Sequence, residues 1–183
     1  MRFYDRLFDG HEGHRYVNEE GAEWDDFGFY AGPPVTRNLR IVLAAPRASA
    51  PAVDPDGIEV EMVARSGAIR FERLVVGVRS LDAARRFYEA IAPVVGLEAV
   101  SDGFRTGETT IELVESAAPT ECLHVAFAAP DDATVREFHR VALAAGYRDN
   151  GPPGERLVYH PGYYGAFVLD PDGLNVEAVN HNR

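Results

Sequence analysis

The last two thirds of the chain alternate between strand-like and helix-like patterns of apolar residues. Residues 69–78 are predicted to form a strand, because apolar side chains recur at every second position from Leu74 to Val78. A helix is expected next, starting at the N-cap residue Ser80 and ending near Gly96, with apolar residues at helical spacing between them. Three short strands are then predicted, at residues 97–101, 103–106 and 109–115.

A second unit repeats this order of elements. Residues 121–129 are predicted to form a strand, Pro130-Asp131-Asp132 opens a helix, and Gly146 suits the left-handed residue that ends it. An irregular strand and loop are expected over 147–160. Two further strands, 163–169 and 174–180, flank the turn Asp170-Pro171-Asp172-Gly173. Strand, helix and three strands, occurring twice, predict the α+β class.

Short sequences of the first 65 residues recur later in the chain at two fixed offsets. Arg2-Phe3-Tyr4 and Ala44-Ala45-Pro46 recur 84 residues later as Arg86-Phe87-Tyr88 and Ala128-Ala129-Pro130. Asp54-Pro55-Asp56-Gly57 recurs 116 residues later as Asp170-Pro171-Asp172-Gly173. The change of offset means that 32 residues are missing from the first copy, and we expect the missing block to hold a helix and two strands.

Residues 1–65 are therefore predicted to be a truncated, degenerate module in front of a complete two-module domain at 66–183. We expect a helix at 2–9, strands near 14–19, 23–30, 38–44 and 57–64, and a loop over the Ala- and Pro-rich stretch 45–55. The alternative is a β-rich extension whose likeness to the rest is fortuitous. Because a truncated module leaves strand edges open, residues 1–65 should pack on the complete domain or on a second subunit.

Composition and charge narrow the function classes. The 183 residues carry a formal charge of -11, with 46% hydrophobic and 26% charged residues, as in an ordinary soluble globular protein. This acidic balance argues against nucleic acid as a partner. No apolar run reaches the length of a membrane helix, which argues against a membrane partner. A single cysteine, Cys122, excludes a disulfide framework and fits the reducing cytoplasm.

Residues 69–183 resemble the glyoxalase/bleomycin-resistance/extradiol-dioxygenase superfamily, also called the vicinal oxygen chelate proteins. Three segments carry the resemblance: Val78-Arg79-Ser80-Leu81-Asp82 with Arg86-Phe87-Tyr88-Glu89, Leu123-His124-Val125-Ala126-Phe127-Ala128-Ala129-Pro130, and Tyr164-Gly165-Ala166-Phe167-Val168 through Asp170-Pro171-Asp172-Gly173 to Val176-Glu177. The resemblance implies paired βαβββ modules that curl an eight-stranded mixed sheet around one open cavity.

The resemblance also implies a divalent metal held by four side chains from four strands. Its ligand positions fall on Arg73, Glu112, His124 and Glu177, and three of the four are residue types that bind metals. A histidine with two carboxylates suits zinc, iron, manganese or nickel. Glu112 and Glu177 are the candidate catalytic carboxylates, which would move a proton while the metal chelates two substrate oxygens. By the 84-residue offset, Arg40 stands where His124 stands, so the truncated copy is not expected to hold a metal.

Arg73 is the departure from the family pattern, because a guanidinium stays protonated and cannot bind a metal. It has three readings: a buried ion pair in the metal's place, a side chain that points away from a three-ligand site, or a clamp on a substrate carboxylate or phosphate. We group Arg73 with His160 and Tyr164 as candidate substrate-binding residues. Each candidate could instead have a purely structural role: His124 as a core histidine, Glu112 in a salt bridge, or Glu177 as a solvated surface residue.

Three functions remain open from the sequence. The first is a metal-assisted lyase, isomerase or dioxygenase that acts on a small oxygenated metabolite. The second is a metal-free protein that binds a drug or natural product and confers resistance, and the third is a metal-free catalyst such as a cyclase. All three have a small molecule as ligand. The family resemblance and the open strand edges of residues 1–65 further predict a homodimer.

Overall fold

The computed structural model describes residues 15–17, 23–25, 36–55 and 57–182. The predicted helix at 2–9 lies outside these residues. Two short strands, β1 (Arg15–Val17) and β2 (Glu23–Asp25), pair antiparallel within the stretches expected to be strands. Neither helix in the described part of the chain is long and apolar enough to cross a membrane.

The first complete module contains β6 (Arg70–Val78), α2 (Leu81–Val95), β7 (Glu98–Val100), β8 (Gly103–Thr106) and β9 (Thr109–Glu115). Its strands lie in the order β6-β9-β8-β7, and β6 is parallel to β9. The Ser80 side chain caps α2 by accepting a hydrogen bond from the backbone of Ala83, and Gly96 follows with a left-handed φ of 70°.

The second module repeats this topology with β10 (His124–Ala128), α3 (Asp132–Ala144), β11 (Arg148–Glu155), β12 (Tyr164–Leu169) and β13 (Asn175–Asn180). Its strands lie in the order β10-β13-β12-β11, and β10 is parallel to β13. Asp131 caps α3 by accepting a hydrogen bond from the backbone of Thr134. The predicted α+β class and the pair of βαβββ modules are confirmed.

The N-terminal strands β3 (Leu39–Ala45), β4 (Ser49–Val53) and β5 (Glu59–Ala64) join the first module. β3 is parallel to β5 and antiparallel to β6, so a seven-stranded sheet runs β4-β5-β3-β6-β9-β8-β7. The prediction of a loop over 45–55 is wrong, since β4 lies there. If residues 1–65 are a truncated copy, as predicted, the presence of β4 reduces the missing block from one helix and two strands to one helix and one strand.

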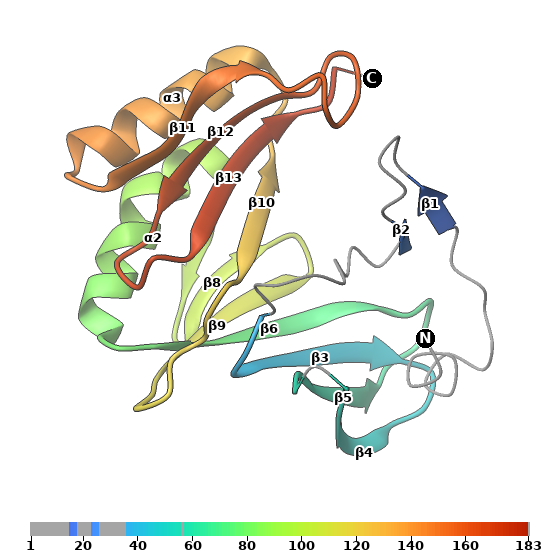
Figure 1. Ribbon diagram of the computed structural model, residues 1–183. Helices are drawn as coiled ribbons and strands as arrows, with labels where there is room; N and C mark the ends of the chain where they lie inside the picture. The colour runs from blue at the N-terminus through green and yellow to red at the C-terminus, as the bar shows by residue number, and fades with distance from the viewer. Residues whose placement is uncertain (1–14, 18–22, 26–35, 56, 183) are drawn as a thin grey trace.

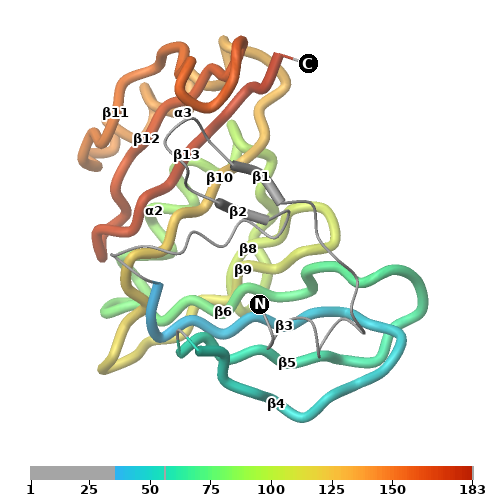
Figure 2. Tube along the Cα trace, turned by 45° about the vertical axis from the view of Figure 1, so that its right-hand side comes forward, coloured from blue at the N-terminus to red at the C-terminus, as the bar shows by residue number. Residues whose placement is uncertain are grey.

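The resemblance implied one eight-stranded sheet shared by the two modules. The structure does not show such a sheet among its described strands. Instead, β6 pairs with β3, and the four strands of the second module form a separate sheet. Figures 1 and 2 show the two sheets, with α2 and α3 beside each other on one side of them. The core lies between helices and sheets and includes the fully buried residues Phe87, Ile91, Val135 and Phe138.

Candidate functional site

A buried carboxylate lies beside an exposed histidine on the inner face of the four-stranded sheet, the face away from α3. His124 Nε2 lies 2.9 Å from Glu177 Oε2, and the exposed fractions of the two side chains are 45% and 1%. Oε2 nevertheless has no hydrogen-bond partner among the described residues, so the contact is close without having hydrogen-bond geometry. The other oxygen, Oε1, accepts a hydrogen bond of 2.7 Å from the Tyr163 hydroxyl.

The topology of the second module explains why these side chains meet. In the parallel pair of β10 and β13, Ala126 lies opposite Glu177, so His124, two residues before Ala126, is on the same face. On the neighbouring strand β12, Gly165 leaves room for the carboxylate, because a Cβ there would lie 2.6 Å from Glu177 Oε1. The ring of Phe167 lies 6.0 Å from the ring of His124.

Tyr163 acts as a fixed hydrogen-bond donor to the carboxylate. Burial, followed by the hydrogen bond to Glu177 and the charge of that group, raises the pKa of Tyr163 far above its ordinary value. The phenol therefore stays protonated throughout the physiological range. Since Tyr163 holds Oε1, Oε2 is the oxygen of Glu177 that can take a proton or a cation.

Arg73 and Glu112 lie in the other sheet, on the adjacent strands β6 and β9. Arg73 Nη1 donates to Glu112 Oε2 over 3.2 Å, with exposed side-chain fractions of 37% and 17%. One reading of Arg73 predicted a buried ion pair in the metal's place, whereas the pair in the structure is formed with Glu112 alone and is only partly buried. A carboxylate held by a guanidinium is a poor ligand for a metal, so this position favours a charge pair over a metal.

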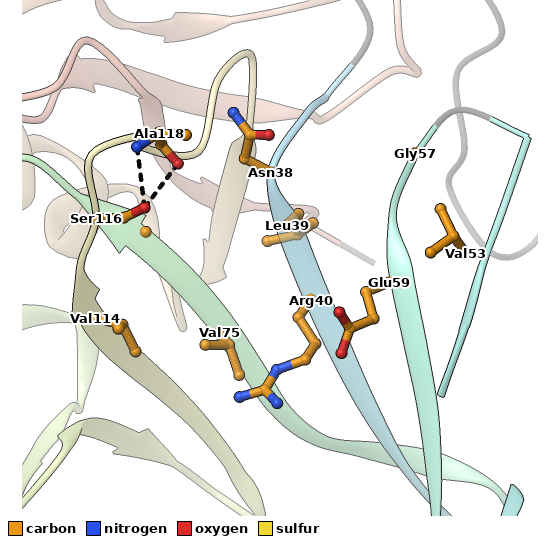
Figure 3. Close-up of a pocket in the computed structure, with 11 residues that line it drawn as sticks. Asn38, Leu39, Arg40, Val53, Gly57, Glu59, Val75, Val114, Ser116 and Ala118 are labelled. Atoms are coloured by element: carbon orange, nitrogen blue, oxygen red, sulfur yellow. Dashed lines mark hydrogen bonds between the residues drawn. The ribbon is translucent and has the colours of Figure 1, made fainter. Parts of the chain in front are cut away.

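A cavity of about 370 Å³ lies on the same face of the seven-stranded sheet, over β3, β5, β6 and β9. Figure 3 shows Arg40 and Glu59 from adjacent strands at its wall, with Val75, Val114 and Ser116 also lining it. Arg40 and Glu59 are half-buried. No ion pair joins them among the described contacts, so both charges are available to a ligand.

The predicted metal ligands are only partly brought together. His124 and Glu177 meet, but Glu112 is held by Arg73 in the other sheet. No group of three or more His, Cys, Asp or Glu side chains lies close enough to hold a metal within the described ranges of the chain. The unpartnered Glu177 Oε2 beside His124 Nε2 fits two ligand positions of a metal site, and a complete site needs donors from elsewhere.

Neither of the two remaining candidates contacts Glu177 directly in the described contacts, although the ring of His160 lies 5.3 Å from the ring of Tyr163. His160 Nε2 is 3.0 Å from His181 Nδ1, and its Nδ1 is 2.8 Å from the carbonyl oxygen of Pro161. Tyr164 is on the helix side of its strand, where its hydroxyl accepts a weak hydrogen bond of 3.4 Å from Arg136 of α3. Tyr163, which donates to the Glu177 carboxylate, is not among the candidates predicted from the sequence. It precedes Gly165 by two positions, and this alternation places it on the face of Glu177.

Comparison with solved structures supports the fold. A glyoxalase/bleomycin resistance protein from Albidiferax ferrireducens is 26% identical, with a TM-score of 0.51, and the match covers 60% of this chain and 97% of that chain. A glyoxalase I mutant from Zea mays is 17% identical, with a TM-score of 0.60, over 78% of this chain and 68% of that chain. The second match covers more than residues 66–183 alone can supply, so it includes residues before position 66.

The sequence itself also places the chain in a family. No curated protein matches it. The family model of the Glyoxalase/Bleomycin resistance protein/Dioxygenase superfamily matches residues 70–178, which span both complete modules. The match covers more than half of the chain, and the strand order of both modules agrees with it. The protein therefore belongs to the glyoxalase/bleomycin resistance/dioxygenase superfamily.

Proposed function

We propose that the protein performs metal-assisted chemistry on a small oxygenated molecule, as a lyase, isomerase or dioxygenase, with His124 and Glu177 as its working residues. The observation that carries the proposal is the buried Glu177 Oε2, which has no hydrogen-bond partner among the described residues and lies 2.9 Å from His124 Nε2. A buried carboxylate oxygen without a partner is costly unless a proton, a cation or a ligand satisfies it.

The chain's own residues prepare this site. Tyr163 fixes the carboxylate through Oε1 and leaves Oε2 directed toward His124. The half-exposed imidazole of His124 brings a second donor atom to the open face of the sheet. A divalent metal held by His124 Nε2 and Glu177 Oε2 would act as a Lewis acid on adjacent substrate oxygens. In the absence of a metal, Oε2 would be the oxygen of Glu177 that accepts a proton.

Elemental analysis of tag-free protein purified without chelators tests this proposal. We expect a bound transition metal in the wild type and its loss in His124→Ala. The control is His139→Ala, because His139 pairs with Asp149 at 3.0 Å, outside the site. Unchanged circular dichroism would show that both variants fold. Wild-type protein without metal after incubation with zinc, or His124→Ala that retains it, would contradict the proposal.

A metal-free binding function is the second candidate, and the seven-stranded sheet favours it. There Arg73 pairs with Glu112, while Arg40 and Glu59 line the cavity without a mutual ion pair. A small molecule with a carboxylate or phosphate group would match Arg40. Titration calorimetry against small carboxylates and phosphate esters tests this: Arg40→Gln should lose binding, whereas the exposed Arg37→Gln should retain it. Equal binding by both variants would exclude the cavity as the site.

A further inference from the structure

One arginine of the second module reaches over the face of the sheet that carries Glu177. Arg156 directly follows β11, and its guanidinium turns back over that strand. Its Nη2 donates a hydrogen bond of 2.7 Å to the carbonyl oxygen of Pro152, and its Nη1 donates a weaker one of 3.4 Å to that of Glu155. The end of this side chain is therefore anchored to the backbone of β11.

Two glycines of β11 leave the room that the guanidinium occupies. A Cβ on Gly154 would lie 2.9 Å from Arg156 Nη1, and a Cβ on Gly151 would lie 3.6 Å from Nη2. Gly151 lies opposite Phe167 of β12, and Phe167 lies opposite Glu177 of β13. Residues that lie opposite each other in paired strands share one face of the sheet. The guanidinium is therefore on the same face as the buried carboxylate.

The ring of Phe167 lies next to both Arg156 and the histidine of the proposed site. The guanidinium carbon is 5.6 Å from the centre of this ring, within the range of a cation–π contact. The ring of His124 is 6.0 Å from the same ring. Burial and Glu177 raise the pKa of Tyr163, and the charge of Arg156 opposes them, so this charge lies near the phenol hydroxyl. A molecule about the size of one aromatic ring can therefore reach from His124 to Arg156.

Within the described part of the chain, no carboxylate forms an ion pair with Arg156. The adjacent Glu155 instead accepts a hydrogen bond of 3.2 Å from the backbone of Gly162, and Asp149 of β11 pairs with His139 of α3. A guanidinium has five N–H donors, and the two bonds to carbonyl oxygens use two of them. A fixed positive charge with donors to spare suits a bidentate bond to an anion.

We propose that Arg156 determines specificity by binding the carboxylate of a small substrate whose adjacent oxygens lie at His124 and Glu177. This inference rests on the proposed function of those two residues and adds the chemical class of the substrate, an oxygenated carboxylic acid. The planar fork of N–H donors matches the two oxygens of a carboxylate. A single guanidinium also supplies one positive charge, which matches a carboxylate better than a dianionic phosphate.

The charges around the site favour an anionic substrate. Glu177 brings one negative charge, which a divalent cation would more than neutralise, and Arg156 adds a positive charge on the same face. With the metal bound, this face carries an excess of positive charge, although the formal charge of the whole chain is -11. An anion would therefore be attracted to this face and repelled by the acidic remainder of the surface.

Titration calorimetry of the full chain with zinc tests the inference, with para-(hydroxyacetyl)benzoate and its neutral amide as probes. Both probes carry two adjacent oxygens and one ring, and they differ only in the charged group. We expect the wild type to bind the benzoate about tenfold or more tightly than the amide, the contribution of a charged hydrogen bond. Arg156→Gln should remove this preference. Arg40→Gln is the matched control, because Arg40 lines the cavity of the other sheet, and it should keep the preference.

Gly154→Ala tests the position of the guanidinium separately from its charge. The added Cβ would lie 2.9 Å from Nη1, at the end of a flexible side chain, so the variant should fold while Arg156 moves aside. We expect the preference for the benzoate to fall although the arginine is still present. Unchanged circular dichroism would show that the variants fold. A preference that persists in Arg156→Gln, or that is lost in Arg40→Gln instead, would overturn the inference.

The same titrations without zinc separate this inference from the proposed function. A preference that needs both zinc and Arg156 would support both. A preference that needs Arg156 but is equal with and without zinc would contradict the metal and leave the role of Arg156 in place. Wild-type protein that binds zinc through His124 but binds both probes equally, or neither, would overturn the role of Arg156 alone.

Discussion

The Tyr163 hydroxyl donates a 2.7 Å hydrogen bond to Glu177 Oε1, from the end of one strand to the buried centre of its neighbour. This bond satisfies one oxygen of a fully buried carboxylate and leaves the other directed toward His124. It sets the orientation of the carboxylate and, with it, the direction from which a cation or proton can approach.

Tyr163→Phe should weaken both stability and metal binding. Removing the donor leaves Oε1 buried without a partner, which costs about 1–3 kcal/mol in the free energy of unfolding. Loss of a residue that orients a metal ligand typically lowers metal affinity about 10–100-fold. Urea denaturation and zinc titration measure the two effects. Tyr159→Phe is the control, because Tyr159 is 58% exposed. Equal behaviour of the two variants would show that the hydrogen bond has no such role.

Gly165→Ala should displace the carboxylate of Glu177. The added Cβ would lie 2.6 Å from Oε1, well inside contact distance, so either the carboxylate or the strand must move. We expect lower stability and loss of zinc binding. In the double variant Gly165→Ala with Glu177→Asp, the shorter side chain should restore part of the stability without restoring zinc binding. If Gly165→Ala binds zinc like the wild type, the position of Glu177 is not critical.

Asp170 gives the stability of the fold a distinct pH dependence. Burial raises the pKa of Asp170 to about 6, although the backbone N–H groups of Leu174 and Asp172 donate hydrogen bonds to it. The folded state therefore binds this proton more tightly than the unfolded state, and the stabilisation is present at low pH and lost as pH rises through about 6.

Comparison of the wild type with Asp170→Asn isolates this effect, because the amide oxygen can still accept both hydrogen bonds. We expect the variant to gain stability relative to the wild type between pH 4 and pH 7.5, by about 2–3 kcal/mol in the free energy of unfolding. Denaturant unfolding of both proteins at the two pH values provides the measurement. A constant difference between them would show that Asp170 does not titrate in this window.

The ion pair of Arg73 and Glu112 should contribute little to stability. Both groups retain contact with solvent, and half-exposed pairs are worth about 0.2–1 kcal/mol. A double-mutant cycle with Arg73→Gln and Glu112→Gln measures the coupling between them. A coupling of several kcal/mol would mean that the pair is a structural anchor of the seven-stranded sheet.

The sequence predicted the two complete modules well because their signals are local. Alternating apolar positions, the caps Ser80 and Asp131 and the glycines 96 and 146 all act within a few residues of the elements they define. β4 was missed because Pro51 and its alanines are poor strand formers. Its pairing with β5 outweighs that local preference.

The sheet pairing and part of the site could not be predicted in this way. Whether β6 takes β3 or β10 as its neighbour depends on contacts between distant segments, and no local pattern encodes that choice. It decides that Arg73 and Glu112, which already lie on neighbouring strands β6 and β9, are in a different sheet from His124. Tyr164 is the tyrosine that the sequence analysis names as a candidate, whereas it is the hydroxyl of the neighbouring Tyr163 that contacts Glu177. The face of a strand changes with every residue, so a shift of one position reverses the assignment.

The most direct test of the account is an anomalous difference map at the zinc edge from crystals of the full chain grown with zinc. We expect a peak bonded to His124 Nε2 and Glu177 Oε2. The pair His160 and His181, whose ring nitrogens lie 3.0 Å apart, is the competing position in the same module. A zinc peak at that pair with none at Glu177, or a map without any peak, would contradict the assignment of His124 and Glu177 as the metal-binding residues.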